Sequence, residues 1–148
     1  MRAAYDALDA ATRAEVEPLV CEHSQLYSRG RLGFTDFTPE EVARFAPIRQ
    51  RLLRTHPVTG RKSLYLSSHA GGIIGWPVPE ARAFLMDLNE AATQREFVHA
   101  HKWQVGDLVM WDNRQTMHRA RPFPAHEPRD LRRTTLMGDG PTAEQVAA

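Results

Sequence analysis

The spacing of apolar residues along the first third of the chain predicts helices. Residues 2–20 place an apolar side chain at roughly every third or fourth position, with charged residues between them. This period is typical of an amphipathic helix. Residues 23–37 are richer in glycine and polar residues, and we expect a loop there. The pattern therefore predicts that residues 1–54 are mostly helical.

A second helix has a clear start signal. Thr38 is suited to the N-cap, Pro39 to the first helical position, and Glu41 falls three residues after the cap. The apolar residues that follow are spaced as one helical stripe. The members of this stripe are Val42, Phe45, Ile48 and Leu52.

Residues 55–138 change to a pattern that favours strands around one helix. Thr59-Gly60 indicates a turn before a strand over 64–66, and Gly71-Gly72 is expected to end that strand. A helix is expected from about Pro79-Glu80, with its apolar face formed by Phe84, Leu85, Leu88 and Ala92. The remaining predicted strands are 96–103, 107–111, 115–121 and 129–137, with a turn at Gly106. Residues 139–148 are expected to form a tail.

Composition narrows the class of protein. The chain has 148 residues, of which 42% are hydrophobic and 25% charged, values typical of one folded domain. Its net charge of +1 gives no field for nucleic acid or an anionic membrane, and no apolar run approaches the ~20 residues of a membrane span. No apolar signal segment follows Met1, and Cys21 is the single cysteine. We therefore expect a cytoplasmic protein without disulfides.

The last predicted hairpin places chemically active groups on one face. If its proline-rich connection, 122–128, is symmetric, His118 stands opposite Arg133. Side chains alternate along a strand, so Arg129 shares that face. Imidazole is a common ligand of transition metals, and guanidinium groups bind carboxylates or sulfonates. The residues alone leave two interpretations open: a site for a small anion near a metal, or a buried histidine beside surface ion pairs.

Three segments resemble one known family. Residues 101–120, from His101-Lys102-Trp103 to Met117-His118-Arg119-Ala120, resemble the C-terminal signature of the taurine dioxygenase / 2,4-dichlorophenoxyacetate dioxygenase family. Residues 56–62 and 129–133 resemble two further segments of it, and the likeness runs across essentially the whole chain. It is closer to the 2,4-dichlorophenoxyacetate branch. The resemblance implies a mainly β fold with about three helices, part of a double-stranded β-helix (jelly roll).

The resemblance also implies roles for individual residues. His118 matches the distal histidine ligand of Fe(II), and Arg129 matches the arginine that binds 2-oxoglutarate. Arg133 matches the arginine that binds the anionic group of the substrate, and His69 lies in a segment that lines the substrate pocket. The implied reaction couples decarboxylation of 2-oxoglutarate to hydroxylation of a small organic anion by O2, such as an aryloxyalkanoate or a sulfonate.

The first two iron ligands of the family are not found in this sequence. They form a His-x-Asp or His-x-Glu motif, and none of the seven histidines has an acid two residues later. We therefore expect residues 1–148 to be the C-terminal portion of one dioxygenase domain, which lacks the rest of the facial triad. Three possibilities follow: an enzyme truncated in this chain, a non-catalytic fragment that self-associates, or half of a split enzyme that needs an N-terminal partner.

Several other residues have both a functional and a structural interpretation. His99 and His101 share a predicted strand face and could chelate a metal, although an exposed histidine pair is the plainer expectation. Asp112 is expected to bond backbone groups in a turn. The remaining residues for which we expect a structural role are His56, Cys21 and, as core or barrel packing, Trp103 and Trp111.

Overall fold

The computed structural model describes residues 1–138 and 140–145, so part of the predicted tail lies outside the described residues. Its helices are α1 (Arg2–Asp6), α2 (Ala10–Val16), α3 (Gln25–Gly30), α4 (Pro39–Arg44), α5 (Val78–Ala92) and the short 3-10 helix η1 (Arg95–Phe97). Its strands are β1 (Val20–His23), β2 (Ile48–Arg51), β3 (Leu53–Thr55), β4 (Lys62–Leu64) and β5 (Ala70–Ile73).

Two small antiparallel sheets form the centre of the molecule. The first has the order β2-β1-β5, and the second pairs β3 with β4. Leu52 connects them: its N–H donates to the carbonyl of Leu19 at 2.9 Å, and its carbonyl accepts from the N–H of Tyr65 at 2.7 Å. The Leu52 side chain is fully buried, so the junction between the sheets is also part of the core.

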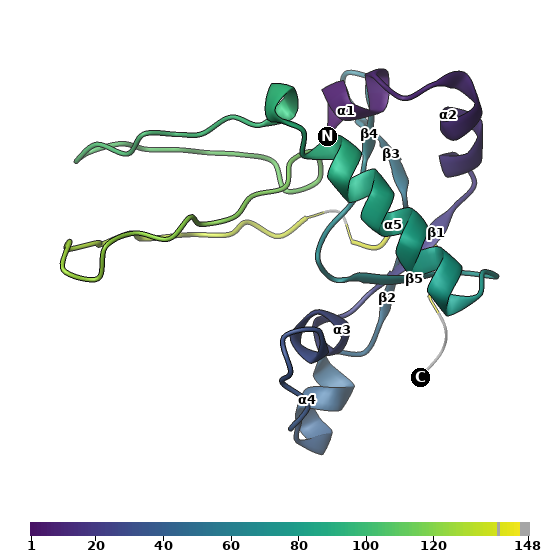
Figure 1. The fold of residues 1–148 in the computed structure, drawn as a ribbon, viewed down its shortest axis with the longest axis horizontal. Coiled ribbons are helices and arrows are strands. Elements are labelled where there is room, and N and C mark those ends of the chain that lie inside the picture. Colours follow the sequence, from purple (N-terminus) through teal and green to yellow (C-terminus); the bar gives the residue numbers. More distant parts are fainter. Residues whose placement is uncertain (139, 146–148) are drawn as a thin grey trace.

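Helix α5 lies across the sheets and closes the core (Figure 1). Its inward face is apolar at helical spacing, so the helix packs as a stripe against β5 and α1. The buried members of that face are Ala81, Leu85, Leu88 and Ala92. The sequence predicted this helix and three of these four residues, and Phe84 packs against the core while partly exposed.

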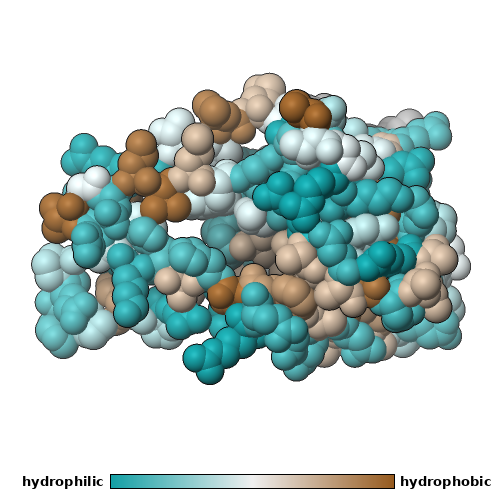
Figure 2. Space-filling view, turned by 90° about the horizontal axis from the view of Figure 1, so that it is seen from above, coloured by the Kyte–Doolittle hydropathy of each residue, from teal (hydrophilic) through white to brown (hydrophobic). Residues whose placement is uncertain are grey.

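Two long extended arms leave this body on one side (Figure 1). The first arm, residues 98–111, turns near Gly106, which has a positive φ of 92°, as the sequence predicted. The second arm, residues 118–138, turns near Pro124. Many apolar side chains of the arms are exposed, and Figure 2 shows some of them as brown groups at the arm side of the molecule.

The prediction of mostly helical structure over 1–54 was wrong. Residues 2–20 break at Asp9, whose carboxylate caps α2 by accepting from the N–H of Thr12 at 2.9 Å. Strands β1, β2 and most of β3 also fall in this region. The expected loop contains helix α3, because the Ser24 hydroxyl caps it by accepting from the N–H of Leu26.

The predicted start of the second helix was confirmed, and its length was wrong. Thr38 and Glu41 form a complete capping box around Pro39 at the start of α4. The helix ends at Arg44, and Ile48 lies in β2. The apolar spacing continued past the helix because Leu52 is buried at the junction between the sheets, whereas Ile48 in β2 is exposed.

The two glycine signals had different outcomes. Gly60 occupies a positive φ of 68° in the turn before β4, as predicted. Gly71 and Gly72 lie inside β5 and do not end a strand, which corrects the prediction. A Cβ on Gly71 would stand 2.6 Å from the ring of Tyr27, so the glycine permits close packing of α3 on the strand.

The strands predicted over 96–137 are absent from the described residues. Residues 95–97 form η1, and both arms are extended without the ladder that defines a strand. A strand needs a hydrogen-bonded neighbour, and no such neighbour is described for either arm. Trp103 and Trp111 are exposed for the same reason, which corrects their expected place in a packed core.

Candidate functional site on the extended arms

His118 is the first residue of the second arm and lies against Trp111. Their ring centroids are 4.9 Å apart with the planes inclined by 54°. The imidazole is exposed, while the neighbouring Met117 packs against the core. His118 is therefore held by an aromatic contact at the point where the arm leaves the body.

The two predicted anion-binding arginines lie further along the same arm. The guanidinium of Arg129 lies over the ring of Phe123, 5.0 Å from its centroid. Arg133 is exposed. No hydrogen bond or ion pair within the described chain joins either arginine to His118, and the antiparallel pairing from which their common face was inferred is not formed. That common face stays a prediction.

The described residues do not by themselves fit an iron ion. No group of three or more His, Cys, Asp or Glu side chains in the described part of the chain could hold a metal. A facial triad needs two imidazoles and one carboxylate around the ion. His118 can supply one donor, and no step of the chemistry is assigned to iron held by this chain alone.

Asp112 has a structural role, as predicted. Its carboxylate accepts from the N–H and the guanidinium of Arg114, with Oδ1 distances of 2.8 and 3.0 Å. This bonding lowers the pKa of Asp112 below its ordinary value. The Asp112 carbonyl also accepts from the N–H groups of Gln115 and Thr116. These bonds fix the turn between the two arms and so position His118.

His99 and His101 lie near each other on the first arm. The two ring centroids are 6.5 Å apart. His101 shares a hydrogen bond with Asp107 across the tip of the first arm, at 2.8 Å between Nε2 and Oδ2. The N–H of Gln104 also donates to that carboxylate, and the two bonds lower the pKa of Asp107. These bonds give His101 a structural role at the tip of the first arm.

His69 lies at a cavity of about 230 Å³ beside helices α3 and α4. Its Nδ1 is 2.7 Å from the Ser28 hydroxyl, so α3 fixes the ring. The cavity walls come from β1, β2, the residues between α4 and β2, which include Phe45, and Tyr65 directly after β4. An imidazole beside aromatic walls suits a small aromatic ligand.

His23 lines the same cavity and was missed by the sequence analysis. Its Nδ1 is 3.1 Å from the Ser67 hydroxyl, and its ring lies 5.3 Å from that of Tyr65. Nε2 is buried without a hydrogen-bond partner among the described residues. Burial, with smaller effects from His69 and Arg54, lowers the pKa of His23 to about 4. No spacing rule could have found this residue, because only the fold brings it to His69.

Two further structural predictions were confirmed. Nδ1 of His56 accepts from the N–H groups of Val58 and Thr59 at 3.2 and 3.1 Å, so this histidine closes its own turn. Cys21 is fully buried in β1, and burial raises the pKa of its thiol to about 12. Because it is buried and its pKa is raised, the Cys21 thiol is not available as a metal ligand or nucleophile.

The fold and the sequence together define the class of protein. A solved structure of AAD-2 in complex with Mn(II) and N-oxalylglycine superposes with a TM-score of 0.92 at 64% identity, covering 97% of this chain and 57% of that one. Because the match covers nearly the whole chain, the arms follow the backbone path of that protein. The fold is that of the Fe(II)- and 2-oxoglutarate-dependent dioxygenases related to taurine dioxygenase.

The chain belongs to the taurine catabolism dioxygenase TauD, TfdA family, which matches residues 1–135. The alpha-ketoglutarate-dependent 2,4-dichlorophenoxyacetate dioxygenase of Cupriavidus pinatubonensis is 48% identical over 94% of this chain and 48% of its own length. The (S)-phenoxypropionate/alpha-ketoglutarate-dioxygenase of Delftia acidovorans is 42% identical over 93% of this chain and 49% of its own. The predicted family and branch are confirmed, and the chain spans about half the length of these relatives.

The cofactor prediction agrees with these relatives. The names of both include alpha-ketoglutarate, and the solved AAD-2 structure holds Mn(II) with N-oxalylglycine, an analogue of 2-oxoglutarate. Fe(II) and 2-oxoglutarate are thus the cofactor and co-substrate of the family. In the part of the chain that the structure describes, no helix is long and apolar enough to cross a membrane.

Proposed function

We propose that this chain forms the C-terminal portion of an Fe(II)- and 2-oxoglutarate-dependent dioxygenase that hydroxylates a small organic anion. The supporting observation is the match to AAD-2 over 97% of the chain, arms included. His118 supplies one iron ligand, and the iron when bound supplies the oxygen chemistry. Arg129 binds the far carboxylate of 2-oxoglutarate, and Arg133 binds the anionic group of the substrate.

An aryloxyalkanoate is the substrate class that the relatives favour. The two relatives described above are named for 2,4-dichlorophenoxyacetate and (S)-phenoxypropionate, both aromatic ethers with a carboxylate. A guanidinium fork fits a carboxylate in two hydrogen bonds, which supports Arg133 as its partner. The cavity beside His69 has aromatic walls that suit the ring. A sulfonate is the alternative anion for the same fork.

Catalysis needs strands that complete the site around the arms. The arms expose apolar side chains and unpaired backbone groups, which added strands of a jelly roll would cover. Such strands would also bring the His-x-Asp ligands to His118. We therefore propose that the described chain is inactive by itself and active when an N-terminal half is supplied.

The test combines this chain with an N-terminal fragment of the Cupriavidus pinatubonensis relative. Anaerobic Fe(II) and 2-oxoglutarate are added, and the metal-to-ligand absorption band is recorded. We expect no band from the chain alone and a band from the mixture that disappears in His118→Ala. A band from the chain alone would overturn the need for a second half. A mixture that associates, as gel filtration shows, and gives no band would overturn the dioxygenase assignment.

A further inference from the structure

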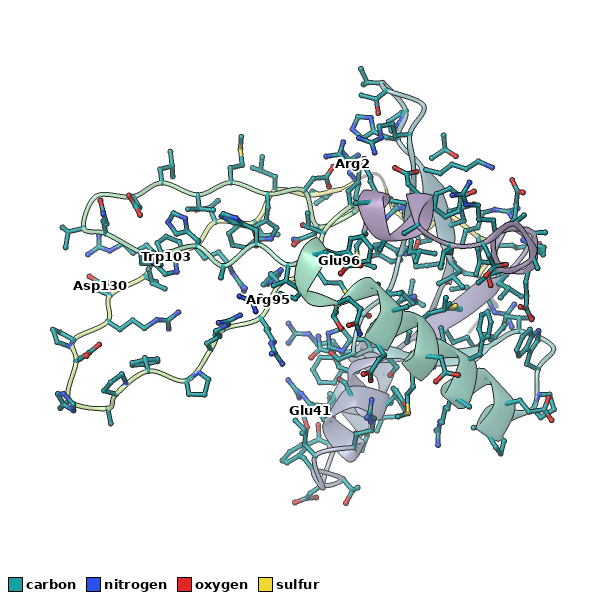
Figure 3. The ribbon with its side chains drawn as sticks, turned by 45° about the horizontal axis from the view of Figure 1, so that its top comes forward. Arg2, Glu41, Arg95, Glu96, Trp103 and Asp130 are labelled. Carbon is teal, nitrogen blue, oxygen red and sulfur yellow. The ribbon has the colours of Figure 1, made fainter. Side chains whose placement is uncertain are left out.

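Three arginines line a cleft at the base of the arms that contains none of the residues assigned above. The cleft has a volume of about 500 Å³ and lies between the end of α5 and the start of the second arm. Figure 3 shows Arg95 at this junction, just beyond α5. The residues that line the cleft are Thr93, Arg95, Val98, Ala100, Arg119 and Arg121.

No acidic side chain in the described part of the chain neutralises the positive charge of this cleft. Among the described residues, the guanidinium groups of Arg95, Arg119 and Arg121 have neither an ion pair nor a hydrogen bond, and no acidic residue lines the cleft. Other arginines of the chain are paired: Arg61 meets Asp6 at 2.8 Å, and Arg49 meets Glu22 at 3.5 Å. Three unpaired guanidinium groups around one cavity repel one another, and a bound anion would relieve that repulsion.

The cleft is distinct from the proposed iron side of the arm. Successive side chains of an extended segment point to opposite faces. Arg119 and Arg121 therefore share one face, and His118 belongs to the other. Arg129 and Arg133 do not line the cleft. A ligand here would not compete with iron or 2-oxoglutarate for their residues.

The lining defines the chemistry of the ligand. The hydroxyl of Thr93 already donates to the carbonyl of Asn89 at 2.7 Å. The guanidinium groups are therefore the side-chain donors of the cleft that can bind an anion. These groups match phosphate and carboxylate oxygens in two hydrogen bonds each. Val98 and Ala100 add a small apolar wall. We propose that this cleft binds a small anion of charge −2 or −3, with oxygens that reach more than one guanidinium.

Calorimetric titration of the full chain with inorganic phosphate tests the proposal. We expect one phosphate per chain, with binding weakened about tenfold or more in either Arg119→Gln or Arg121→Gln, because each variant loses a charged hydrogen-bond donor. Arg119→Lys should retain part of the affinity. The matched control is Arg132→Gln, which removes another exposed arginine that lies outside the cleft and is paired with Asp130 at 3.7 Å. It should bind phosphate like the unmodified chain.

A parallel titration with citrate separates the two oxyanion chemistries. Tighter binding of citrate would identify a polycarboxylate as the ligand, and tighter binding of phosphate would identify a phosphate. Absence of binding by both anions at millimolar concentration would overturn the proposal. Equal affinity in the Arg119→Gln, Arg121→Gln and unmodified chains would also overturn it. Because the substituted side chains are exposed, circular dichroism of the variants should be unchanged, and this measurement confirms that the fold is intact.

Discussion

His118 lies against the indole ring of Trp111, with 4.9 Å between the ring centroids. The two residues stand on either side of the Asp112 turn, so the turn that joins the arms also sets the direction of the imidazole. A single exposed imidazole would otherwise rotate freely. This contact gives the proposed iron ligand a fixed position before the other ligands arrive.

Removal of the indole should therefore weaken metal binding without removing a ligand. In the mixture of this chain with the N-terminal fragment, Trp111→Ala should lower iron affinity by about 10–100-fold, the range for residues that orient metal ligands. Titration of the mixture with Fe(II), followed by the metal-to-ligand absorption band, measures this affinity. Trp103→Ala is the control, because its indole packs 4.7 Å from His101 and not on His118. Equal losses in both variants would contradict an orienting role for Trp111.

The two assigned arginines should separate in their kinetic effects. In the same mixture, Arg129→Ala should raise the KM for 2-oxoglutarate much more than the KM for the organic substrate. Arg133→Ala should do the reverse, because each guanidinium is assigned to a different anion. Steady-state kinetics with each substrate varied in turn gives the comparison. If both variants raised the two KM values equally, the separate roles would be wrong.

Buried His23 should make the stability of the chain depend on pH. Its folded pKa is about 4, against about 6.5 in an unfolded chain, so the unfolded state takes up the proton first as pH falls. The contribution of His23 to the free energy of unfolding is fully present above about pH 6.5. It is lost as the pH falls toward 4, a decrease on the order of 3 kcal/mol for this residue alone. Urea unfolding at pH 7 and pH 4.5 measures the change. His23→Asn should show a smaller decline, whereas exposed His126→Asn should behave as the unmodified chain.

Gly71 should be intolerant of a side chain. Gly71→Ala places a Cβ 2.6 Å from the Tyr27 ring, and overpacking of this kind costs about 1–3 kcal/mol. Gly72→Ala is the matched control in the same strand, because its Cβ would meet no atom closer than 4.0 Å. Thermal unfolding compares the two. Adding Tyr27→Ala to Gly71→Ala should remove most of the additional cost of the alanine, and equal effects at both glycines would contradict the close approach.

Local signals in the sequence predicted the elements whose stability is local. The capping box at Thr38 and Glu41 and the turn at Gly60 depend on residues within a few positions of one another. The apolar face of α5 likewise follows from the spacing of apolar residues within one short segment. These predictions were confirmed because a cap, a turn and an amphipathic stripe depend mainly on neighbouring residues.

Predictions of strands, which need a partner far away in the sequence, were often wrong. The strands expected over 96–137 have β-like composition, yet a ladder depends on a second segment at hydrogen-bonding distance. The same dependence left the pairing of His118 with Arg133 unformed. Conversely, β5 forms despite two glycines, because β1 supplies the partner and the ring of Tyr27 fills the space at Gly71.

The sequence by itself determined the family, through the residues around His118 and the Arg129–Arg133 segment, because these motifs reflect the chemistry of metal and anion binding. Only the tertiary structure decided what surrounds His23 and brought Arg95 to Arg119 and Arg121. The physical reason is that burial and unpaired charge arise from contacts between segments far apart in the chain, which no local spacing encodes.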